Sequence, residues 1–573
     1  MEVRIKRSAV QIMIAVLGLG FATNCAGSQS ASPETVDTDP RPNIVLVLFE
    51  DMSPRVGAFG DTLAVTPNFD RIAREGVRYT NVFTTSGVCA PSRAALITGH
   101  YQHTIGAQHM RTTNAAGLPT GGPQPYLAVP PPYLKAFPET LRAAGYHTSN
   151  DSKTDYQFGE PFTVWDISGQ GADWTGRSEG QPFFHMRSFF NTHESAIWPK
   201  TMEPTNPVEA FLVDRNQTVF AERASTVSPE DVPVPPYLPD TPEVRQDIAT
   251  HYDNIAFTDE ALGALYDRLN EEGVLDETIL IVSTDHGDGL PRMKRSLYDS
   301  GLHVPMVIRY PDGWGAGTLN DELISFIDFA PTILSWADLN PSETLHGRDF
   351  AGADRDPERA YVFAAQDRMD SEMSRRRAVR DERYKYIRNF QEMDPYFEPL
   401  AFRGSQPSMK ALWAGRADGT LSEAANRLFE PLPEEQFYDT LKDPHEIHNL
   451  ATDEDYNSER IRLRAELEGW MEAYGDMSNV SEVDMIYEMW PGGEQPATKP
   501  VGADWERVGA SYQVTLASDT IGASIGYRLG GEESPWQLYS GPLRVAPGTV
   551  LQAKAIRYGY AESPTETVNV PDR

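Results

Sequence analysis

The chain has 573 residues, of which 40% are hydrophobic, and its 83 acidic and 50 basic side chains give a net charge of −33. This length predicts more than one domain, with ample room for hydrophobic cores. The acidity excludes nucleic acid as a partner, because the sequence offers no extended basic surface. If the substrate is an anion, local cations must overcome the field of the whole chain.

The N-terminus predicts export. Three basic residues precede an apolar run over 9–21, which is too short to anchor the chain across a bilayer. We therefore expect a signal peptide over 1–25 and a linker over 26–41. Cys25, followed by Ala-Gly-Ser, leaves lipidation open beside simple cleavage. The expected location is the periplasm or cell surface of a bacterium, with membrane contact only through a lipid anchor at Cys25.

The first predicted elements alternate in type. An apolar run over 43–49 predicts a strand that is buried on both faces, as in a parallel sheet. A helix is expected over 67–75, with Thr66 as its N-cap and Gly76 as its stop. The stretch 77–84 predicts the next strand.

The alternation continues along the chain. We expect a helix over 139–144, a strand over 182–190, a helix over 247–270 and a strand over 278–283. This order predicts the α/β class, with a large, mostly parallel sheet flanked by helices in a domain over 42–350.

Two of these strands end in acidic residues. Glu50 and Asp51 follow the first strand, and Asp285 and His286 follow the strand over 278–283. If the two strands are parallel neighbours, the two pairs meet at the carboxyl edge of the sheet, where ligands bind in such folds. Like charges held together there require a cation.

The sequence changes character near residue 497. Short alternating stretches separated by Gly, Pro and Ser predict strands over 511–516, 523–529, 543–545 and 550–557. We expect a small appended β-sandwich over 497–573. It resembles modules attached to bacterial carbohydrate-active enzymes, such as the C-terminal module of chitobiases. A structural spacer is the expected role, because no aromatic platform for glycan binding is apparent.

Cys89 is the residue with the most specific surroundings. The only other cysteine is Cys25, so the fold has neither an intrachain disulfide nor a cysteine cluster for zinc. Ala-Pro-Ser-Arg follows and starts a predicted helix. A helix N-terminus with Arg93 one turn along suits chemistry on an anion. A buried structural thiol is the plainer alternative.

The stretch Cys-x-Pro-Ser-Arg, with Thr-Gly-His a few residues later, resembles the signature of type I sulfatases of the alkaline phosphatase superfamily. In that family the cysteine is oxidised to formylglycine (3-oxoalanine), by a formylglycine-generating or an anaerobic sulfatase-maturing enzyme. The resemblance covers roughly 42–475. It implies a smaller α+β subdomain over 351–480, whose last helix is expected over 461–474.

The resemblance also implies a metal site. Glu50 and Asp51 fall where the family has two aspartates, and Asp285 and His286 match its later metal-binding pair. With Cys89, these residues form the expected ligand set. Oxygen-rich ligation favours Ca²⁺, with Mg²⁺ as the alternative.

The catalytic set implied by the resemblance comprises Cys89, Arg93, Lys153, His193 and Lys294. Lys153 lies in a Gly-Tyr-x-Thr-x-x-x-x-Lys segment, and Lys294 lies in Lys-x-x-x-Tyr. His193 follows a strand where the family has a Pro-His pair. Arg93 and the two lysines would neutralise the sulfate oxygens, and His193 or Lys294 would protonate the leaving alcohol.

The chain departs from the family at one position. The family continues Lys-x-His after its lysine, whereas this chain has Asp155. In the implied mechanism the aldehyde of formylglycine hydrates to a diol. One hydroxyl attacks sulfur, and the second then loses a proton and expels sulfate. The base for that second step stays open between Asp155, His147 and another group.

The predicted function is an exported sulfatase that acts on a sulfated glycan. Because the Asp-Arg-Met-Asp stretch over 367–370 resembles the heparan N-sulfatase branch, N-sulfoglucosamine hydrolysis is an alternative. Hydrolysis of phosphonate or phosphate monoesters is a second, and a catalytically silent glycan-binding protein is a third.

Overall fold

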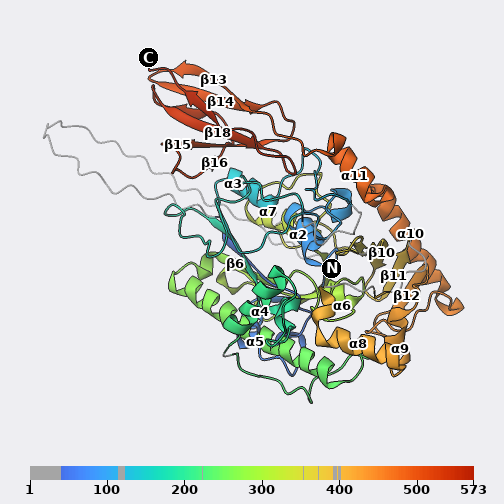
Figure 1. Cartoon of the computed structure of the whole chain (residues 1–573). Helices are drawn as coiled ribbons and strands as arrows, with labels where there is room; N and C mark the ends of the chain where they lie inside the picture. The colour runs from blue at the N-terminus through green and yellow to red at the C-terminus, as the bar shows by residue number, and fades with distance from the viewer. Residues whose placement is uncertain are drawn as a thin grey trace, which may run out of the picture. The chain divides into compact units, whose positions relative to one another are not determined.

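The computed structural model describes residues 41–113, 123–221, 223–352, 354–371, 373–390, 396–397 and 402–572 (Figure 1). The expected signal peptide, Cys25 and all but the last residue of the expected linker lie outside the described residues. The described residues form one compact unit. Within the described residues, every helix is too short or too polar to cross a bilayer.

An eight-stranded sheet with the order β4-β3-β5-β1-β6-β7-β2-β8 is the centre of the fold. Its strands are β1 (Asn43–Phe49), β2 (Val77–Phe83), β3 (His147–Asp151), β4 (Ile167–Ser168), β5 (Phe183–Phe189), β6 (Thr278–Thr284), β7 (His303–Arg309) and β8 (Leu319–Ser325). Only β7 runs antiparallel to its neighbours, β6 and β2. The predicted α/β class with a mostly parallel sheet is confirmed.

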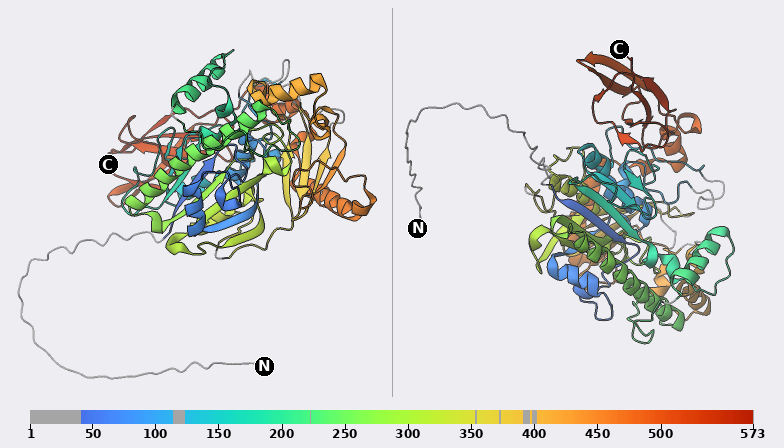
Figure 2. Two further views of the ribbon diagram at one scale, coloured as in Figure 1. Left: turned by 90° about the horizontal axis from the view of Figure 1, so that it is seen from below. Right: turned by 90° about the vertical axis from the view of Figure 1, so that its left-hand side faces the viewer.

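Helices cover both faces of this sheet (Figure 2). Alternate residues of β1 belong to different cores: Ile44 packs with residues of α2, α3 and α7, whereas Val45 packs with residues of α1 and α5. This two-sided burial explains the continuous apolar run of β1. The helices are α1 (Pro67–Glu75), α2 (Cys89–Thr98), α3 (Phe137–Ala143), α4 (Pro207–Val219), α5 (Pro242–Glu271), α6 (Asp299–Leu302) and α7 (Phe329–Trp336).

The ends of α1 differ from the capping that we expected. Thr66 precedes α1, but its hydroxyl accepts a hydrogen bond from the Gly57 N–H (2.9 Å) and caps no N–H of the helix. Gly76 has φ −135°, so it is not a left-handed cap. A Cβ on Gly76 would lie 2.3 Å from the carbonyl oxygen of Ile308, so the close approach of β7 requires the glycine.

A second, antiparallel sheet with the order β12-β11-β10-β9 follows in the chain. It comprises β9 (Val362–Gln366), β10 (Arg376–Arg380), β11 (Tyr384–Asn389) and β12 (Glu435–Asp439), accompanied by α8 (Pro407–Asp418), α9 (Glu423–Asn426), α10 (Asn457–Tyr474) and α11 (Glu482–Met489). The helix expected over 461–474 is present as α10, the last α-helix within the expected bounds of 351–480, and α11 follows beyond them. Glu482 of α11 forms a buried ion pair with Arg368 (2.7 Å), which ties this additional helix to the domain.

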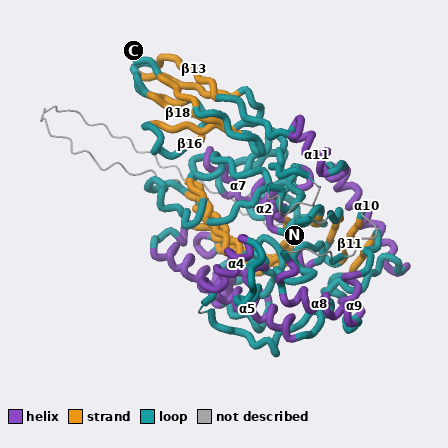
Figure 3. The backbone as a smooth tube through the Cα atoms, in the orientation of Figure 1, coloured by secondary structure: helices purple, strands orange, loops and turns teal. Residues whose placement is uncertain are grey.

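The C-terminal segment forms two antiparallel sheets, β13-β14-β17 and β16-β15-β18-β19, that share one apolar core. Figure 3 shows strands and loops in this region. The strands are β13 (Val501–Val508), β14 (Ser511–Ser518), β15 (Ser524–Leu529), β16 (Gln537–Leu538), β17 (Leu543–Val545), β18 (Val550–Ile556) and β19 (Glu566–Asn569). The four predicted strands are present. β13 had escaped prediction because it is an exposed edge strand without clear alternation.

Contacts with α3 and with the segments before and after it link this module to the first domain. The buried Tyr558 ring stacks on Phe158 with the ring centres 5.0 Å apart, and its hydroxyl donates to Glu139 Oε2 (2.8 Å). Lys135 Nζ donates to the carbonyl oxygen of Gly522 (2.9 Å). A polar network that is buried in this way holds the module in one orientation.

Candidate active site

The two acidic strand ends meet at the centre of the sheet. β1 and β6 are parallel neighbours with Phe49 opposite Thr284, so the residues that follow each strand emerge side by side. The Asp51 N–H donates to Asp285 Oδ1 (3.1 Å). Asp51 has φ +50°, a conformation that is uncommon for residues other than glycine. The surrounding contacts therefore hold the turn after β1 in a defined geometry.

Cys89 lies against these strand ends as the first residue of α2. Its Sγ lies 3.2 Å from His286 Nε2 and 3.8 Å from Asp51 Oδ1, and the residue is 1% exposed. No side chain caps the N-terminus of α2. The free N–H groups and the helix dipole therefore favour negative charge beside Cys89.

Two predicted cations bind the carboxylates on one side of Cys89. Arg93, one turn along α2, donates from Nε to Asp285 Oδ2 (3.1 Å) and from Nη1 to Ser188 Oγ (2.9 Å). Its Nη2 lies 3.5 Å from Glu50 Oε1. Lys153 Nζ donates to Glu50 Oε2 (3.0 Å). Burial raises the pKa of Glu50 above its ordinary value. Lys153 and Arg93 oppose this shift but do not cancel it.

Lys294 occupies the other side of the site. Its Nζ donates to both carboxylate oxygens of Asp51 (2.7 and 2.9 Å) and lies 3.2 Å from Glu194 Oε1. Burial would raise the pKa of Asp51, but Lys294 and then His193 hold it well below its ordinary value of 3.8. Asp51 is therefore a carboxylate at neutral pH.

His193 contributes an imidazole with a defined tautomer. Its Nδ1 accepts a hydrogen bond from the Ser195 N–H (3.3 Å), which places the proton of the neutral ring on Nε2. Burial, followed by the charge of Lys294, holds the pKa of His193 well below 6.5. A ring nitrogen of His193, Cys89 Sγ and carboxylate oxygens of Glu50 and Asp51 all lie within 4.8 Å of one another.

The donor set of a cation site is also present. Ligand atoms of Asp51, Cys89, Asp285 and His286 lie within 4.8 Å of one another, and all four residues are buried. The His286 Nδ1 pairs with the Gly287 carbonyl oxygen (2.9 Å), so Nε2 faces the carboxylates. Burial alone would lower the pKa of His286, but Asp285, Cys89 and Asp51 raise it to about 10. The space between these side chains therefore attracts positive charge, and Asp51, Asp285 and His286 fit a divalent cation. Glu50 belongs instead to the group described above with His193, which shares Asp51 and Cys89 with this one.

The two named candidates for the second proton transfer lie apart. Asp155 Oδ2 lies 3.6 Å from Lys153 Nζ, at the carboxyl end of β3. His147 is the first residue of β3 and therefore lies at the opposite edge of the sheet, where its Nδ1 lies 4.0 Å from Asp166 Oδ2. The structure thus separates His147 from the site and leaves Asp155 beside it.

The sequence reasoning missed one buried ion-pair chain. Arg295 donates from both Nη atoms to Glu194 (2.8 and 2.9 Å), and from Nε to Asp370 Oδ2 (3.1 Å). The Glu194 N–H in turn donates to Asp51 Oδ2 (2.7 Å). One local feature of the sequence could have indicated this chain of ion pairs. Glu194 directly follows His193, and Arg295 directly follows Lys294. Their pairing depends on a contact between distant loops.

The comparisons with known proteins agree with this geometry. Residues 42–339 match the family model described as Sulfatase, and 292–403 match the C-terminal model of N-sulphoglucosamine sulphohydrolase. An ulvan-active sulfatase of Formosa agariphila is 40% identical over 559 residues, which cover 93% of this chain and 92% of that protein. Human N-sulphoglucosamine sulphohydrolase is 26% identical over 470 residues, covering 75% and 89%.

Among solved structures, BT4656 in complex with its substrate D-glucosamine-2-N,6-O-disulfate matches with a TM-score of 0.52 at 20% identity, over 77% of this chain and 99% of that one. The chain belongs to the sulfatase family and is a sulfuric ester hydrolase. Because a 93% match omits fewer residues than 497–573 contains, the likeness to the Formosa protein extends into the C-terminal module.

We predict that Arg295→Met destabilises the protein by roughly 3–5 kcal/mol at pH 7, because it leaves the buried Glu194 carboxylate without its bidentate partner. Burial would raise the pKa of Glu194, but Arg295 and then Lys294 hold it below its ordinary 4.5. A carboxyl group whose pKa is lower in the folded protein than in the unfolded chain stabilises the fold at pH values above its unfolded pKa. This stabilisation is lost as the pH falls towards the folded pKa. The deficit of the variant should therefore shrink below pH 4.5. Urea unfolding of the variant and the wild type at several pH values measures this difference in the free energy of unfolding.

Arg464→Gln, on the surface helix α10, serves as the control and should change the free energy of unfolding by less than about 0.5 kcal/mol. An Arg295→Met deficit no larger than that of the control would show that the chain from Asp370 to Asp51 contributes no stability.

Proposed function

We propose that this enzyme is exported, that it hydrolyses sulfate esters of a sulfated polysaccharide, with ulvan as the leading candidate, and that the reacting group is formylglycine formed from Cys89. The observation that carries the proposal is the position of Cys89. It starts a helix against two acidic strand ends, within a cluster of buried cations. The likeness to an ulvan-active sulfatase along almost the whole chain supports the substrate class.

The first half-reaction uses groups on both sides of Cys89. A hydroxyl of the hydrated aldehyde gives its proton to a carboxylate such as Asp285 and attacks sulfur, and the bond from sulfur to the alcohol oxygen breaks. Arg93, Lys153 and Lys294 are fixed by their carboxylate partners and receive the sulfate oxygens without reorganising. The departing alcohol takes a proton from Lys294 Nζ, which Asp51 and Glu194 keep as an ammonium ion. The neutral His193 ring donates a hydrogen bond from Nε2, the nitrogen that the Ser195 contact leaves protonated.

The residues Asp51, Asp285 and His286, together with position 89 and with Glu50 beside them, would hold the divalent cation, and we propose Ca²⁺ with Mg²⁺ as the alternative. When bound, such an ion withdraws electrons from the oxygen atoms it contacts. Maturation requires a formylglycine-generating or anaerobic maturing enzyme as a partner.

The second half-reaction needs a base. The remaining hydroxyl loses a proton, its oxygen forms the carbonyl bond again, and the bond from carbon to the sulfate oxygen breaks. We propose that Asp155 takes this proton, because it is the carboxylate beside Lys153, at the position where the family has histidine. Its left-handed backbone, with φ +62°, is consistent with a residue that the loop holds in place.

N-sulfoglucosamine hydrolysis is the second candidate. The match of 292–403 to the C-terminal model of that enzyme, and the human relative, favour it. The higher identity and coverage of the ulvan-active relative favour sulfate esters instead. Release of sulfate from ulvan oligosaccharides and from N-sulfoglucosamine, measured in parallel, distinguishes the two.

The maturation of Cys89 is the first test. Mass spectrometry of its peptide, after co-expression with a maturing enzyme, should show an aldehyde in place of the thiol. Cys89→Ala should lower sulfate release by at least about 1,000-fold, because the covalent route is then lost. An unmodified thiol in an enzyme that releases sulfate at full rate would contradict the mechanism.

The role of Asp155 predicts a separation of the two products. Asp155→Asn should still release about one equivalent of nitrophenol from 4-nitrophenyl sulfate in a burst. Steady-state sulfate release should slow by about 100-fold, the usual contribution of a general base. Rapid-mixing kinetics measures both steps, and Asp173→Asn on an outer loop is the matched control. If the burst and the steady state fall together, Asp155 does not act as the base.

A further inference from the structure

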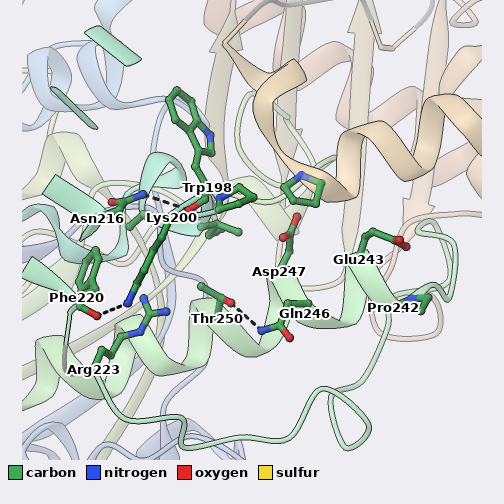
Figure 4. Close-up of a pocket in the computed structure, with 14 residues that line it drawn as sticks. Trp198, Lys200, Asn216, Phe220, Arg223, Pro242, Glu243, Gln246, Asp247 and Thr250 are labelled. Carbon is green, nitrogen blue, oxygen red and sulfur yellow. Dashed lines mark hydrogen bonds between the residues drawn. The ribbon is translucent and has the colours of Figure 1, made fainter. Parts of the chain in front are cut away.

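A second pocket lies next to the His193 loop (Figure 4). It has a volume of about 490 Å³, within the range of small-molecule sites, and is formed by the segment after His193, by α4 and by the first turns of α5. Trp198 lines it, and its ring lies 4.7 Å from that of Phe402, which lies 6.3 Å from the His193 ring. The pocket and the active site therefore share an aromatic wall.

One end of this pocket is cationic. Lys200 and Arg223 lie there next to each other beside Phe220, as Figure 4 shows. Among the residues that the structure describes, no carboxylate pairs with either cation. Lys200 Nζ donates to the Phe220 carbonyl oxygen, and Arg223 donates to Asn254 Oδ1. Burial lowers the pKa of Arg223 below 12.5, and the charge of Asp253 offsets this shift only in part.

A third cation connects this end to the active site. The guanidinium of Arg215 lies 4.8 Å from the Phe190 ring centre and 5.4 Å from that of Phe220. Lys153 Nζ lies 6.0 Å from the same Phe190 ring, and the Arg223 guanidinium lies 4.9 Å from Phe220. Arg215 also pairs with no carboxylate in the described part of the chain. Its buried Nη1 has no hydrogen-bond partner there. We call Lys153, Arg215, Arg223 and Lys200 the basic track.

The other end of the pocket offers groups for sugar hydroxyls. Asp247, Gln246 and Thr250 lie along α5, on the side of the pocket away from Lys200 (Figure 4). The Ser408 N–H donates to Asp247 Oδ2 (2.8 Å). A sugar that carries one anionic group and several hydroxyls matches this division into a cationic end and an amide and carboxyl end.

We propose that this pocket is a second glycan subsite, which binds a neighbouring sugar of the substrate through a carboxylate or sulfate held by Arg223 and Lys200 while the sulfate to be cleaved lies at Cys89. The inference rests on the proposed function. Among the described residues, none of the three cations beyond Lys153 forms a direct ion pair with a carboxylate, although Asp253 and Glu50 act on Arg223 and Arg215 at longer range. In a chain whose net charge is −33, an anionic ligand would supply the close partner that these cations lack.

The test compares long and short substrates. Arg223→Gln, and its double variant with Lys200→Gln, should raise KM for ulvan oligosaccharides about tenfold, the loss expected for a charge-assisted hydrogen bond. Turnover of 4-nitrophenyl sulfate, which is too short to reach the pocket, should change less than about twofold. Arg223→Lys, which keeps the charge, should recover most of the affinity. Arg464→Gln is the matched control and should behave as wild type with both substrates.

Two arms identify the anionic group. If reduction of carboxyl groups on the oligosaccharide removes the Arg223 effect, the anionic group is a carboxylate, and if removal of a neighbouring sulfate does so, it is a sulfate. Calorimetry with the Cys89→Ala background measures affinity without turnover. Unchanged oligosaccharide affinity in the charge variants, or equal losses with both substrates, overturns the subsite. Failure of the wild type to release sulfate from any substrate would instead overturn the proposed function.

Discussion

Two buried carboxylates, Asp51 and Asp285, meet where adjacent parallel strands end, and the rest of the site depends on keeping them ionised and close together. Removed from water, such a pair is stable only with compensating positive charge. Lys294 supplies it to Asp51, and Arg93 supplies it to Asp285. His286 points Nε2 at the same place. Cys89 lies beside this pair, where we propose that the reacting group forms.

The same compensation explains how a strongly acidic chain can receive a sulfate. Every buried carboxylate of the site is already paired: Glu50, Asp51, Glu194 and Asp285 each contact at least one lysine or arginine. A divalent ion added to such a balanced cluster would give it a net positive charge, which would attract an anionic substrate over the short range that salt leaves unscreened. The surface charge of the chain then matters little at the reacting atoms.

Much of the site could be predicted from local patterns, because β1 and β6 are apolar runs and the residues after such strands lie at one edge. The chain from Asp370 through Arg295 and Glu194 could not, since those residues are far apart in sequence and each resembles a surface charge. The position of His147 could not be predicted either. Only the direction of β3 shows that His147 lies at the edge of the sheet opposite the site. The exposed β13 lacks the alternation that indicates a strand, whereas Asp155 was found because it replaces a motif residue.

Calcium titration of the metal-free protein, followed by isothermal calorimetry, tests the central claim most directly. The account predicts binding of a single ion per chain. It also predicts that Asp51→Asn and Asp285→Asn each weaken that binding by at least about tenfold, because each removes a charged ligand from the cluster. Asp173→Asn should leave the affinity unchanged. Equal calcium affinity in all three variants and the wild type would show that the acidic strand ends hold no cation and would contradict the account.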